Sequence, residues 1–318
     1  MSKAPRILVT GASGFIGQHL VKALALSGYQ VRAAARQPIV FDDPRIEGLA
    51  LGDMSRSFAA EYLVRGVDVV VHAAGMAHAK PGIPDSAYTA INVDATREIA
   101  RAARAAKVKR FVLMSSIRAQ VGATHEGVVS EATPSAPTDA YGRSKEAAEA
   151  VTSAVLEGSS TRWTVLRPVL VYGSGVKGNM AALMRLAALP VPLPFRAAKS
   201  RRSLVSIGNL VAAIRHILDA KAAENATFVV ADREAVTMAE VIRSVRRGMG
   251  AHPLLFPLSE TVLASGLRLV GKPDLAERLT GELVVDAAKL RSIGWAPPET
   301  TTEALAAAAQ SRRFDVRH

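Results

Sequence analysis

The chain has 318 residues, 49% of them hydrophobic and 21% charged, with no cysteine and a net charge of +12. This composition is typical of a globular protein with a sizeable core, and the lack of cysteine excludes a disulfide framework and a thiol nucleophile. The positive charge raises nucleic-acid binding as a function, but the denser basic clusters at 196–202 and 243–247 lack interleaved aromatic residues, so we expect an anionic small molecule and no nucleic-acid partner.

The first predicted elements are a strand, a glycine-rich turn and a helix between residues 6 and 27. Gly11 permits a tight turn after the strand, Gly14 removes a side chain where a ligand phosphate would approach, and Gly17 lets the helix pack closely on the sheet. The helix N-terminus then offers N–H groups to an anion. The stretch predicts a dinucleotide pyrophosphate site with candidate contacts at Gly11, Ser13, Gly14, Phe15, Ile16 and Gly17.

The second predicted strand, 31–35, ends beside the residue that selects the cofactor. A carboxylate there would bind the adenosine ribose hydroxyls and repel a 2′-phosphate, but the chain carries Arg36. Arg36 could pair with a 2′-phosphate through charge-assisted hydrogen bonds, and Arg32 is a weaker candidate. We therefore expect NADP(H) to be favoured, with NAD(H) as the alternative.

Further strands and helices alternate along the first half of the chain. The predicted strands lie at 49–53, 67–72, 110–116 and 163–166, and the predicted helices at 87–106 and 140–156. This alternation predicts an α/β fold with a doubly wound parallel sheet, in which ligands bind beyond the carboxyl ends of the strands.

The regular alternation weakens after residue 173. Prolines accumulate from 189 to 194, a strand is predicted at 203–207 and a helix at 210–218, and the remainder is rich in helix. We expect a cofactor-binding domain at 1–173 and a smaller, mixed substrate lobe at 174–318, with 203–221 crossing back to the first domain.

Tyr141 and Lys145 lie one turn apart on the same face of a predicted helix. An ammonium near a phenol stabilises the phenolate, so we expect Lys145 to lower the pKa of Tyr141 from about 10 and make it an acid or base near neutral pH. Ser116, at the end of the strand at 110–116, could hydrogen-bond the same substrate oxygen. The three residues predict a proton-transfer site beside the cofactor.

These features together resemble the extended short-chain dehydrogenase/reductase family, in its nucleotide-sugar epimerase, dehydratase and reductase branch. The resemblance spans nearly the whole chain, and it implies a Rossmann-type sheet with helices on both faces. It rests on the segments 10–17, Gly52-Asp53, 72–75, Asn92-Val93, Ser115-Ser116, 141–145, Leu166-Arg167-Pro168 and 171–173.

The resemblance also implies roles for individual residues. Beyond the glycine turn and Arg36, the implied cofactor contacts are Asp53, Met54, Ala73, Ala74, Gly75, Asn92, Tyr141, Lys145, Pro168 and Val169. Asn179 and Arg202 match positions that hold the sugar-nucleotide diphosphate, and Arg278 is a weaker candidate for that role. The other candidate substrate contacts are Ser116, Arg118 and His78, the last in a loop close to the expected sugar position.

Within the branch, the chain looks most like bacterial proteins labelled UDP-glucose 4-epimerase, some of which are similar to 4-ketoreductases that make UDP-N-acetylquinovosamine for surface polysaccharides. The resemblance implies a C4 reductase or epimerase acting on a UDP-sugar. The missing acidic residue near Arg36 favours a reductase that consumes NADPH, and Ile117-Arg118 replaces the Ala-Thr of well-known epimerases. The alternatives are a nonenzymatic NADP(H)-binding redox sensor or regulator and a reductase of a small apolar ketone.

The sequence also bears on the location and the assembly of the protein. No apolar run is long enough to span a membrane, and the first strand begins too early for a signal peptide, so a cytoplasmic protein is expected. The seven histidines show no metal-ligand spacing, so we expect no metal site. A homodimer paired through the helices at 87–106 and 140–156 is expected by analogy with the family.

Overall fold

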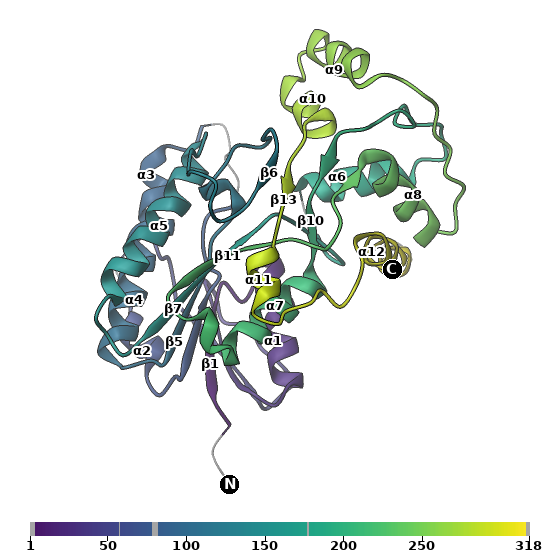
Figure 1. Ribbon diagram of the computed structural model, residues 1–318. Helices are drawn as coiled ribbons and strands as arrows, with labels where there is room; N and C mark the ends of the chain where they lie inside the picture. The colour runs from purple at the N-terminus through teal and green to yellow at the C-terminus, as the bar shows by residue number, and fades with distance from the viewer. Residues whose placement is uncertain (1–3, 57, 78–81, 177, 316–318) are drawn as a thin grey trace.

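A computed structural model describes residues 4–56, 58–77, 82–176 and 178–315. The chain forms a larger lobe around a central sheet and a smaller lobe built from the second half (Figure 1). No helix in the described part of the chain combines the length and the apolar character needed to cross a bilayer.

Seven parallel strands form the central sheet, in the order β11-β7-β5-β4-β1-β2-β3. β5 is buried at every position and β1 at all but its first, as expected for strands covered on both faces. The strand order reverses between β1 and β4, which is where ligands bind in such sheets. The strands are β1 Arg6–Thr10, β2 Gln30–Ala35, β3 Ile46–Ala50, β4 Val69–His72, β5 Arg110–Met114, β7 Arg162–Pro168 and β11 Ala226–Val230.

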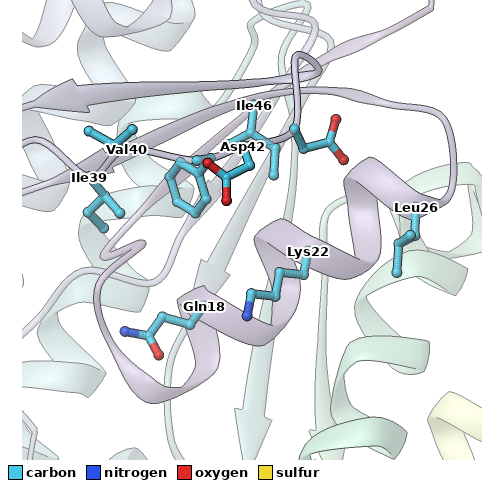
Figure 2. Close-up of a pocket in the computed structure, with 9 residues that line it drawn as sticks. Gln18, Lys22, Leu26, Ile39, Val40, Asp42 and Ile46 are labelled. Atoms are coloured by element: carbon cyan, nitrogen blue, oxygen red, sulfur yellow. The ribbon is translucent and has the colours of Figure 1, made fainter.

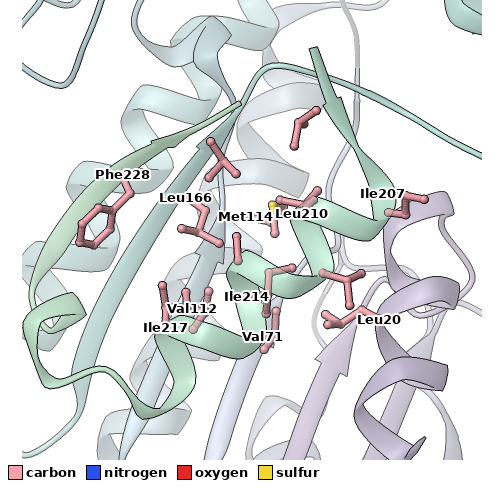
Figure 3. Packing of buried hydrophobic residues seen from close by; sticks show 14 of the residues in the cluster. Leu20, Val71, Val112, Met114, Leu166, Ile207, Leu210, Ile214, Ile217 and Phe228 are labelled. Atoms are coloured by element: carbon pink, nitrogen blue, oxygen red, sulfur yellow. The ribbon is translucent and has the colours of Figure 1, made fainter. Parts of the chain in front are cut away.

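Helices cover both faces of this sheet, which confirms the predicted doubly wound fold. One face packs on α2 (Ala60–Val64), α4 (Ala95–Ala105) and α5 (Ala140–Leu156). The other packs on α1 (Phe15–Leu26), α7 (Ile207–Asp219) and α11 (Ala288–Ser292). Figure 3 shows Leu210, Ile214 and Ile217 of α7 pointing toward Val71, Val112 and Leu166 of the sheet.

The long helix predicted at 87–106 is interrupted in the structure. The helical segment consists of α3 (Asp85–Tyr88), a π-helical stretch at Thr89–Asp94, and α4. Single π turns inside helices frequently occur at functional sites, because they turn one side chain away from the regular spacing. Here the π turn contains the buried side chain of Asn92.

The predicted strand at 49–53 is shifted relative to β3, which ends at Ala50. Gly52, with a φ of +73°, turns the chain, so Asp53 lies in a turn beyond the strand. Gly52 and Asp53 therefore belong to the loop that follows β3. The alternation of apolar residues in the sequence does not show where the strand ends and this loop begins.

The smaller lobe packs around its own buried cluster, contributed by α6, α8 and α12. The segment from 207 to 230 returns to the larger lobe as α7 and β11. The helices of the smaller lobe are α6 Gly178–Ala188, α8 Met238–Gly248, α9 Glu260–Leu269, α10 Pro273–Thr280 and α12 Thr301–Asp315. Three two-stranded pairs complete the fold: β8 Leu170–Tyr172 with β10 Leu204–Ser206, β9 Arg201–Arg202 with β12 Val236–Thr237, and β6 Val128–Val129 with β13 Val284–Val285. Two 3₁₀ turns lie at Ile117–Ala119 and Lys221–Ala223.

Candidate active site

The glycine turn between β1 and α1 has no room for side chains. Gly11 has a φ of +72°, and a Cβ there would lie 2.7 Å from the backbone nitrogen of Ala74. A Cβ on Gly17 would lie 2.1 Å from the carbonyl oxygen of Gly11. The turn is tied to the next strand by a hydrogen bond from Ala12 N to Ala34 O of 3.1 Å. Two of the three predicted glycines are therefore required by close backbone contacts.

The first turn of α1 faces the end of β1 and is suited to an anion. Gly14 is the N-cap residue, so no side chain covers the first N–H groups of the helix, and its first turn contains no acidic residue. Ser13, Phe15 and Ile16 flank this end. The cradle fits the pyrophosphate of a dinucleotide, and the exposed N–H groups with the positive end of the helix dipole would stabilise its charge.

Arg36 and Asp53 lie near each other in the part of the site where the adenosine of the cofactor is predicted to bind. Arg36 follows β2 and is exposed. The pKa of Asp53 is lowered most by the hydrogen bond from Ser55 N to its carboxylate, and the charge of Arg36 acts in the same direction. Met54 is half-buried against the core behind this turn. Arg32, the weaker candidate for a 2′-phosphate, is buried, contacts Glu47 at 3.0 Å and donates to backbone carbonyls of α2, so it does not reach this corner.

Ala73, Ala74 and Gly75 form a narrow wall beyond β4. A Cβ on Gly75 would lie 2.9 Å from Asn92 Oδ1 and 3.3 Å from Lys145 Nζ. Asn92 accepts a hydrogen bond from Met76 N (2.8 Å) and donates to Ser144 Oγ (2.9 Å), so it joins this turn to α5. The π turn thereby holds the wall against the helix that carries Tyr141 and Lys145.

His72 supports the same region from inside the core. Its ring contacts Thr10 Oγ1 at 2.7 Å and Thr96 Oγ1 at 3.0 Å. Burial, with a smaller contribution from Lys145, lowers the pKa of His72 to about 3, so the ring stays neutral. His72 therefore acts as a structural residue in the core.

Ser116, Tyr141 and Lys145 meet at the carboxyl end of β5. A side-chain hydrogen bond joins Tyr141 to Ser116. Lys145 Nζ donates to Met114 O at 2.8 Å, and burial lowers the pKa of Lys145 to about 8. The predicted proton-transfer residues thus lie together at the edge of the sheet where the glycine turn also lies.

The expected lowering of the Tyr141 pKa is wrong for the protein alone. Burial raises the pKa of Tyr141, and the hydrogen bond to Ser116 opposes that effect only in part. Lys145 is not among the groups that shift the pKa of Tyr141, and its ammonium donates a hydrogen bond to the Met114 carbonyl. In this state the phenol is protonated at neutral pH, which is the form that donates a proton.

Glu149 is a buried residue that the sequence reasoning missed. It lies one turn beyond Lys145, its carboxylate accepts three hydrogen bonds of 2.6–3.1 Å from Arg167, and it also accepts a hydrogen bond from Ser115 Oγ. Its charge raises the pKa of Lys145, against the larger effect of burial. The spacing of four residues between Lys145 and Glu149 could have pointed to Glu149. The partners of Glu149, however, come from β7 and the end of β5, which the spacing does not reveal.

Arg118 lies between the catalytic candidates and the smaller lobe. Its Nη2 contacts Asp139 Oδ2 at 2.6 Å, and the other carboxylate oxygen of Asp139 accepts Gly142 N at 2.7 Å as the N-cap of α5. Nη1 of Arg118 is buried and has no hydrogen-bond partner within the described residues. The charge of Arg118 influences the pKa of both Tyr141 and Arg202, so it is close to both groups.

The remaining substrate candidates are only partly brought together. Arg202 Nη1 donates to Arg278 O at 2.6 Å, which joins β9 to α10. Burial lowers the pKa of Arg202, and the like charges of Arg118 and Arg278 act in the same direction. Asn179 lies in the first turn of α6, while its side chain and the whole of His78 lie outside the described residues.

Pro168 ends β7 and Val169 follows it, at the same edge of the sheet. Both are buried, and Val169 N donates to Val230 O at 3.1 Å. Across the described ranges, no group of three or more potential metal ligands is found. A groove of about 590 Å³ lies elsewhere, where Gln18, Lys22 and Leu26 of α1 face the segment 39–46 (Figure 2), and no candidate site residue lines it.

Comparison with known proteins identifies the family. The model of the NAD-dependent epimerase/dehydratase family matches residues 7–231. The chain belongs to this family. Members of the family are NAD-dependent enzymes, and the fold, the glycine turn and the site at the end of β5 fit such an enzyme.

Similar family members and structures agree with this assignment. The UDP-glucose 4-epimerase of Vibrio cholerae is 37% identical over 317 residues, covering 97% of this chain and 96% of that protein. The ceramide reductase of Caulobacter vibrioides is 29% identical over 264 residues, covering 82% of this chain and 76% of that protein. The structure of MoeE5 in complex with UDP-glucuronic acid and NAD has a TM-score of 0.78 at 25% identity, covering 98% and 99% of the two chains.

Proposed function

We propose that this protein is a NAD(P)-dependent oxidoreductase that acts at C4 of a UDP-sugar, in the synthesis of surface polysaccharide. The observation that carries the proposal is the hydrogen bond between Tyr141 and Ser116 beside Lys145, at the same sheet edge as the glycine turn. This arrangement joins a proton-transfer group to a dinucleotide cradle, which is what oxidation or reduction of an alcohol requires.

The proposed roles follow from the contacts. When bound, the nicotinamide supplies hydride acceptance and donation at C4 of the sugar. Tyr141 gives a proton to the C4 oxygen in reduction and takes it in oxidation, and Ser116 orients that oxygen by a hydrogen bond. Lys145 places its ammonium at the carboxyl end of β5, where it would hold the nicotinamide ribose. Gly11, Gly14 and Gly17 hold the pyrophosphate, with Pro168 and Val169 flanking the nicotinamide.

A UDP-sugar is supported by positive charge at the far side of the site. The charges of Arg118 and Arg278 both act on the pKa of Arg202, and guanidinium groups bind phosphate oxygens in a bidentate manner. The Vibrio cholerae relative is named for a UDP-sugar, and MoeE5 was solved with one. An apolar ketone, suggested by the resemblance to ceramide reductase, would bring no phosphate to these guanidinium groups.

The same hydride transfer serves a reductase or a 4-epimerase, and different observations support each reaction. A reductase that consumes NADPH is supported by Arg36 near the adenosine end, and by the protonated state of Tyr141, which suits donation of a proton. A 4-epimerase, which returns the hydride, is supported by the name of the Vibrio cholerae relative and by NAD in the MoeE5 structure. We take the reductase as the first candidate because its support comes from residues of this chain.

A panel of substrates and cofactors separates these possibilities. The purified protein is incubated with UDP-4-keto sugars, UDP-N-acetylglucosamine or UDP-glucose, each with NADPH, NADH or NAD, and both absorbance and product identity are followed. Net oxidation of NADPH with a 4-keto sugar supports the reductase, and interconversion of epimers without net change in cofactor supports the epimerase. Cofactor binding without turnover of any sugar would instead support the redox sensor or regulator.

The variant Tyr141→Phe tests the proposed acid. We expect turnover to fall by at least about 100-fold, the scale of general acid catalysis, while binding of the cofactor changes little. Turnover follows from absorbance at saturating substrate, and cofactor binding from calorimetry. Tyr62→Phe, at an exposed position, is the control, and near-normal turnover by the Tyr141 variant would refute the assigned role.

Location, assembly and domain roles remain predictions of the same proposal. Nucleotide sugars and nicotinamides are cytoplasmic metabolites, so we propose the cytoplasm as the site of action. A homodimer through α4 and α5 is proposed by family analogy, and sedimentation equilibrium would test it. We also propose that residues 1–173 bind the cofactor and 174–318 the substrate, with 203–221 returning to the first domain.

A further inference from the structure

Exposed apolar side chains are frequent along the segment 254–275 of the smaller lobe. Among the described residues, the large exposed ones between 254 and 275 are Leu254, Phe256, Val262, Leu269, Val270 and Leu275. The loop at 189–191, which adds exposed Leu189 and Val191, lies alongside the first of these. Such a concentration marks an interaction surface, whereas single exposed apolar residues need no explanation.

The turn between α9 and α10 is the most exposed part of this edge. Leu269 is 88% exposed and Val270 66%. Gly271 ends α9 with a φ of +73°, and hydrogen bonds from Lys272 N to Leu267 O (2.9 Å) and from Gly271 N to Arg268 O (3.0 Å) form a Schellman motif. The two apolar side chains are thus held outward by an ordered turn, at the end of a hairpin that projects from the lobe (Figure 1).

The neighbouring loops are also held in place. Leu193 N donates to Leu254 O, Phe256 N donates back to Leu193 O, and Arg196 N donates to Phe256 O, at 3.0–3.1 Å. The buried guanidinium of Arg246 donates to the carbonyls of Ala187, Leu189, Val191 and Leu254. Glu260, in the first turn of α9, accepts hydrogen bonds from Lys199 N and Ser200 N. We call the segments 189–199, 254–256 and 268–272 the outer rim.

The charge of the outer rim is positive. Exposed basic residues flank its apolar side chains, namely Arg196 and Lys199 in the first loop and Arg268 and Lys272 at the helical turn. The first loop lies within residues 158–218, a stretch without aspartate or glutamate, whereas Asp274 follows Lys272 by two residues beyond the helical turn. A surface that combines protruding apolar groups with cations matches an anionic bilayer, where the apolar groups enter the interface and the cations stay at the headgroups.

We propose that the outer rim docks the protein on an anionic membrane surface, with Leu269 and Val270 entering the interface. The exposed apolar side chains of the outer rim lie in loops and at one helical turn. A stable interface with a protein partner would need a broad surface of about 800 Å² on each side, so a membrane surface is the better match. The same hairpin holds Arg202 through the carbonyl of Arg278. Docking therefore brings the candidate substrate end of the site close to the membrane.

Vesicle sedimentation with the full chain tests this proposal. Large unilamellar vesicles of phosphatidylcholine alone are compared with vesicles that contain about 30% phosphatidylglycerol, a content that gives a negative surface potential. We expect the protein to sediment with the anionic vesicles only, and the binding to weaken as salt increases. The double variant Leu269→Ser/Val270→Ser should lower the partition coefficient by about 10-fold or more, because the apolar contribution is removed.

Matched variants make the result specific. Val40→Ser removes a side chain that is 91% exposed on the larger lobe, and it should bind like the original protein. Arg268→Gln/Lys272→Gln should reduce both the binding and its salt dependence. Circular dichroism checks that each variant is folded.

Several outcomes would overturn the proposal. They are absence of binding to anionic vesicles, equal binding to neutral vesicles, or full binding by the Leu269/Val270 variant. A dimer in light scattering that this variant dissociates would assign the outer rim to a second copy of the chain instead. The measurement needs no turnover, so failure here leaves the proposed function standing, and failure of the substrate panel leaves this proposal standing.

Discussion

Glu149 connects the end of β5, the end of β7 and the helix of the candidate acid. Its carboxylate holds Arg167 and Ser115, the neighbour of Ser116, and it lies one turn from Lys145. Burial of an ammonium lowers its pKa, and a nearby carboxylate raises it. The pKa of Lys145, about 8, therefore reflects strong burial that Glu149 partly offsets.

The pH dependence of turnover should report this balance. The role proposed for Lys145 needs its ammonium form, so turnover should decline on the alkaline side as pH rises through about 8. In Glu149→Gln the offsetting charge is lost, the pKa of Lys145 falls further, and the decline should move to lower pH. The measurement is the pH profile of kcat, normalised to its maximum so that loss of folded protein does not affect the comparison.

Glu146→Gln is the matched control for this profile. Glu146 lies next to Lys145 on α5, but it is not among the groups that shift the pKa of Lys145. Its variant should keep the alkaline limb of the original protein. An unchanged limb in Glu149→Gln would mean that Glu149 serves the fold alone.

At the residue scale, the sequence predicted contacts within a motif better than contacts between motifs. The spacing of Tyr141 and Lys145 and the position of Ser116 led to a cluster that the structure brings together. Glu149 escaped notice because its partners are supplied by separate strands. The direction of the Tyr141 pKa was wrong for a related reason, since the extent of burial depends on the whole fold.

At the element scale, the turn between β1 and α1 is set by backbone contacts. Gly17→Ala places a Cβ 2.1 Å from the Gly11 carbonyl oxygen, so α1 must move away from the turn. We expect cofactor affinity to fall by at least about 10-fold and stability to fall by about 1–3 kcal/mol, the cost typical of overpacking. Calorimetry with NAD and NADP and thermal unfolding measure the two effects.

Gly266→Ala in α9 is the control for this substitution. A Cβ at Gly266 meets nothing within 4 Å, and alanine favours a helix over glycine by about 1 kcal/mol. This variant should bind the cofactor normally and be equally or more stable. If Gly17→Ala also bound the cofactor normally, the turn would tolerate more movement than its contacts indicate.

Elements with strong periodicity were predicted well, and short ones were not. Most strands of the central sheet and α5 follow from apolar runs and helical spacing, whereas β3 is shifted from the predicted 49–53. The π turn at Thr89–Asp94 and the two-residue strands β9 and β12 carry no periodic signal, since tertiary hydrogen bonds define them. Most of the smaller lobe was therefore described only as mixed.

At the scale of the whole molecule, a buried polar network joins the two lobes. Tyr172 Oη donates to Asp232 Oδ2 at 2.8 Å and also contacts Thr301 O at 3.1 Å, at the start of α12. Asp232 further accepts Ser206 N and Asn209 Nδ2, both at or near the N-terminus of α7. Burial raises the pKa of Asp232, and these donors oppose that effect. The network fixes β8, β10 and α7 against the last helix.

Tyr172→Phe tests how much the two lobes depend on this network. The variant keeps the ring in the core and removes one donor from a buried carboxylate, so we expect the free energy of unfolding to fall by about 1–3 kcal/mol. Chemical denaturation of the full chain measures the change, with Tyr62→Phe, 52% exposed, as the control that should leave stability unchanged. Because Tyr172 and Asp232 lie between segments of both lobes, the loss should shift one shared transition. Equal stability of the two variants would show that the lobes are joined by apolar packing, with no net contribution from this hydroxyl.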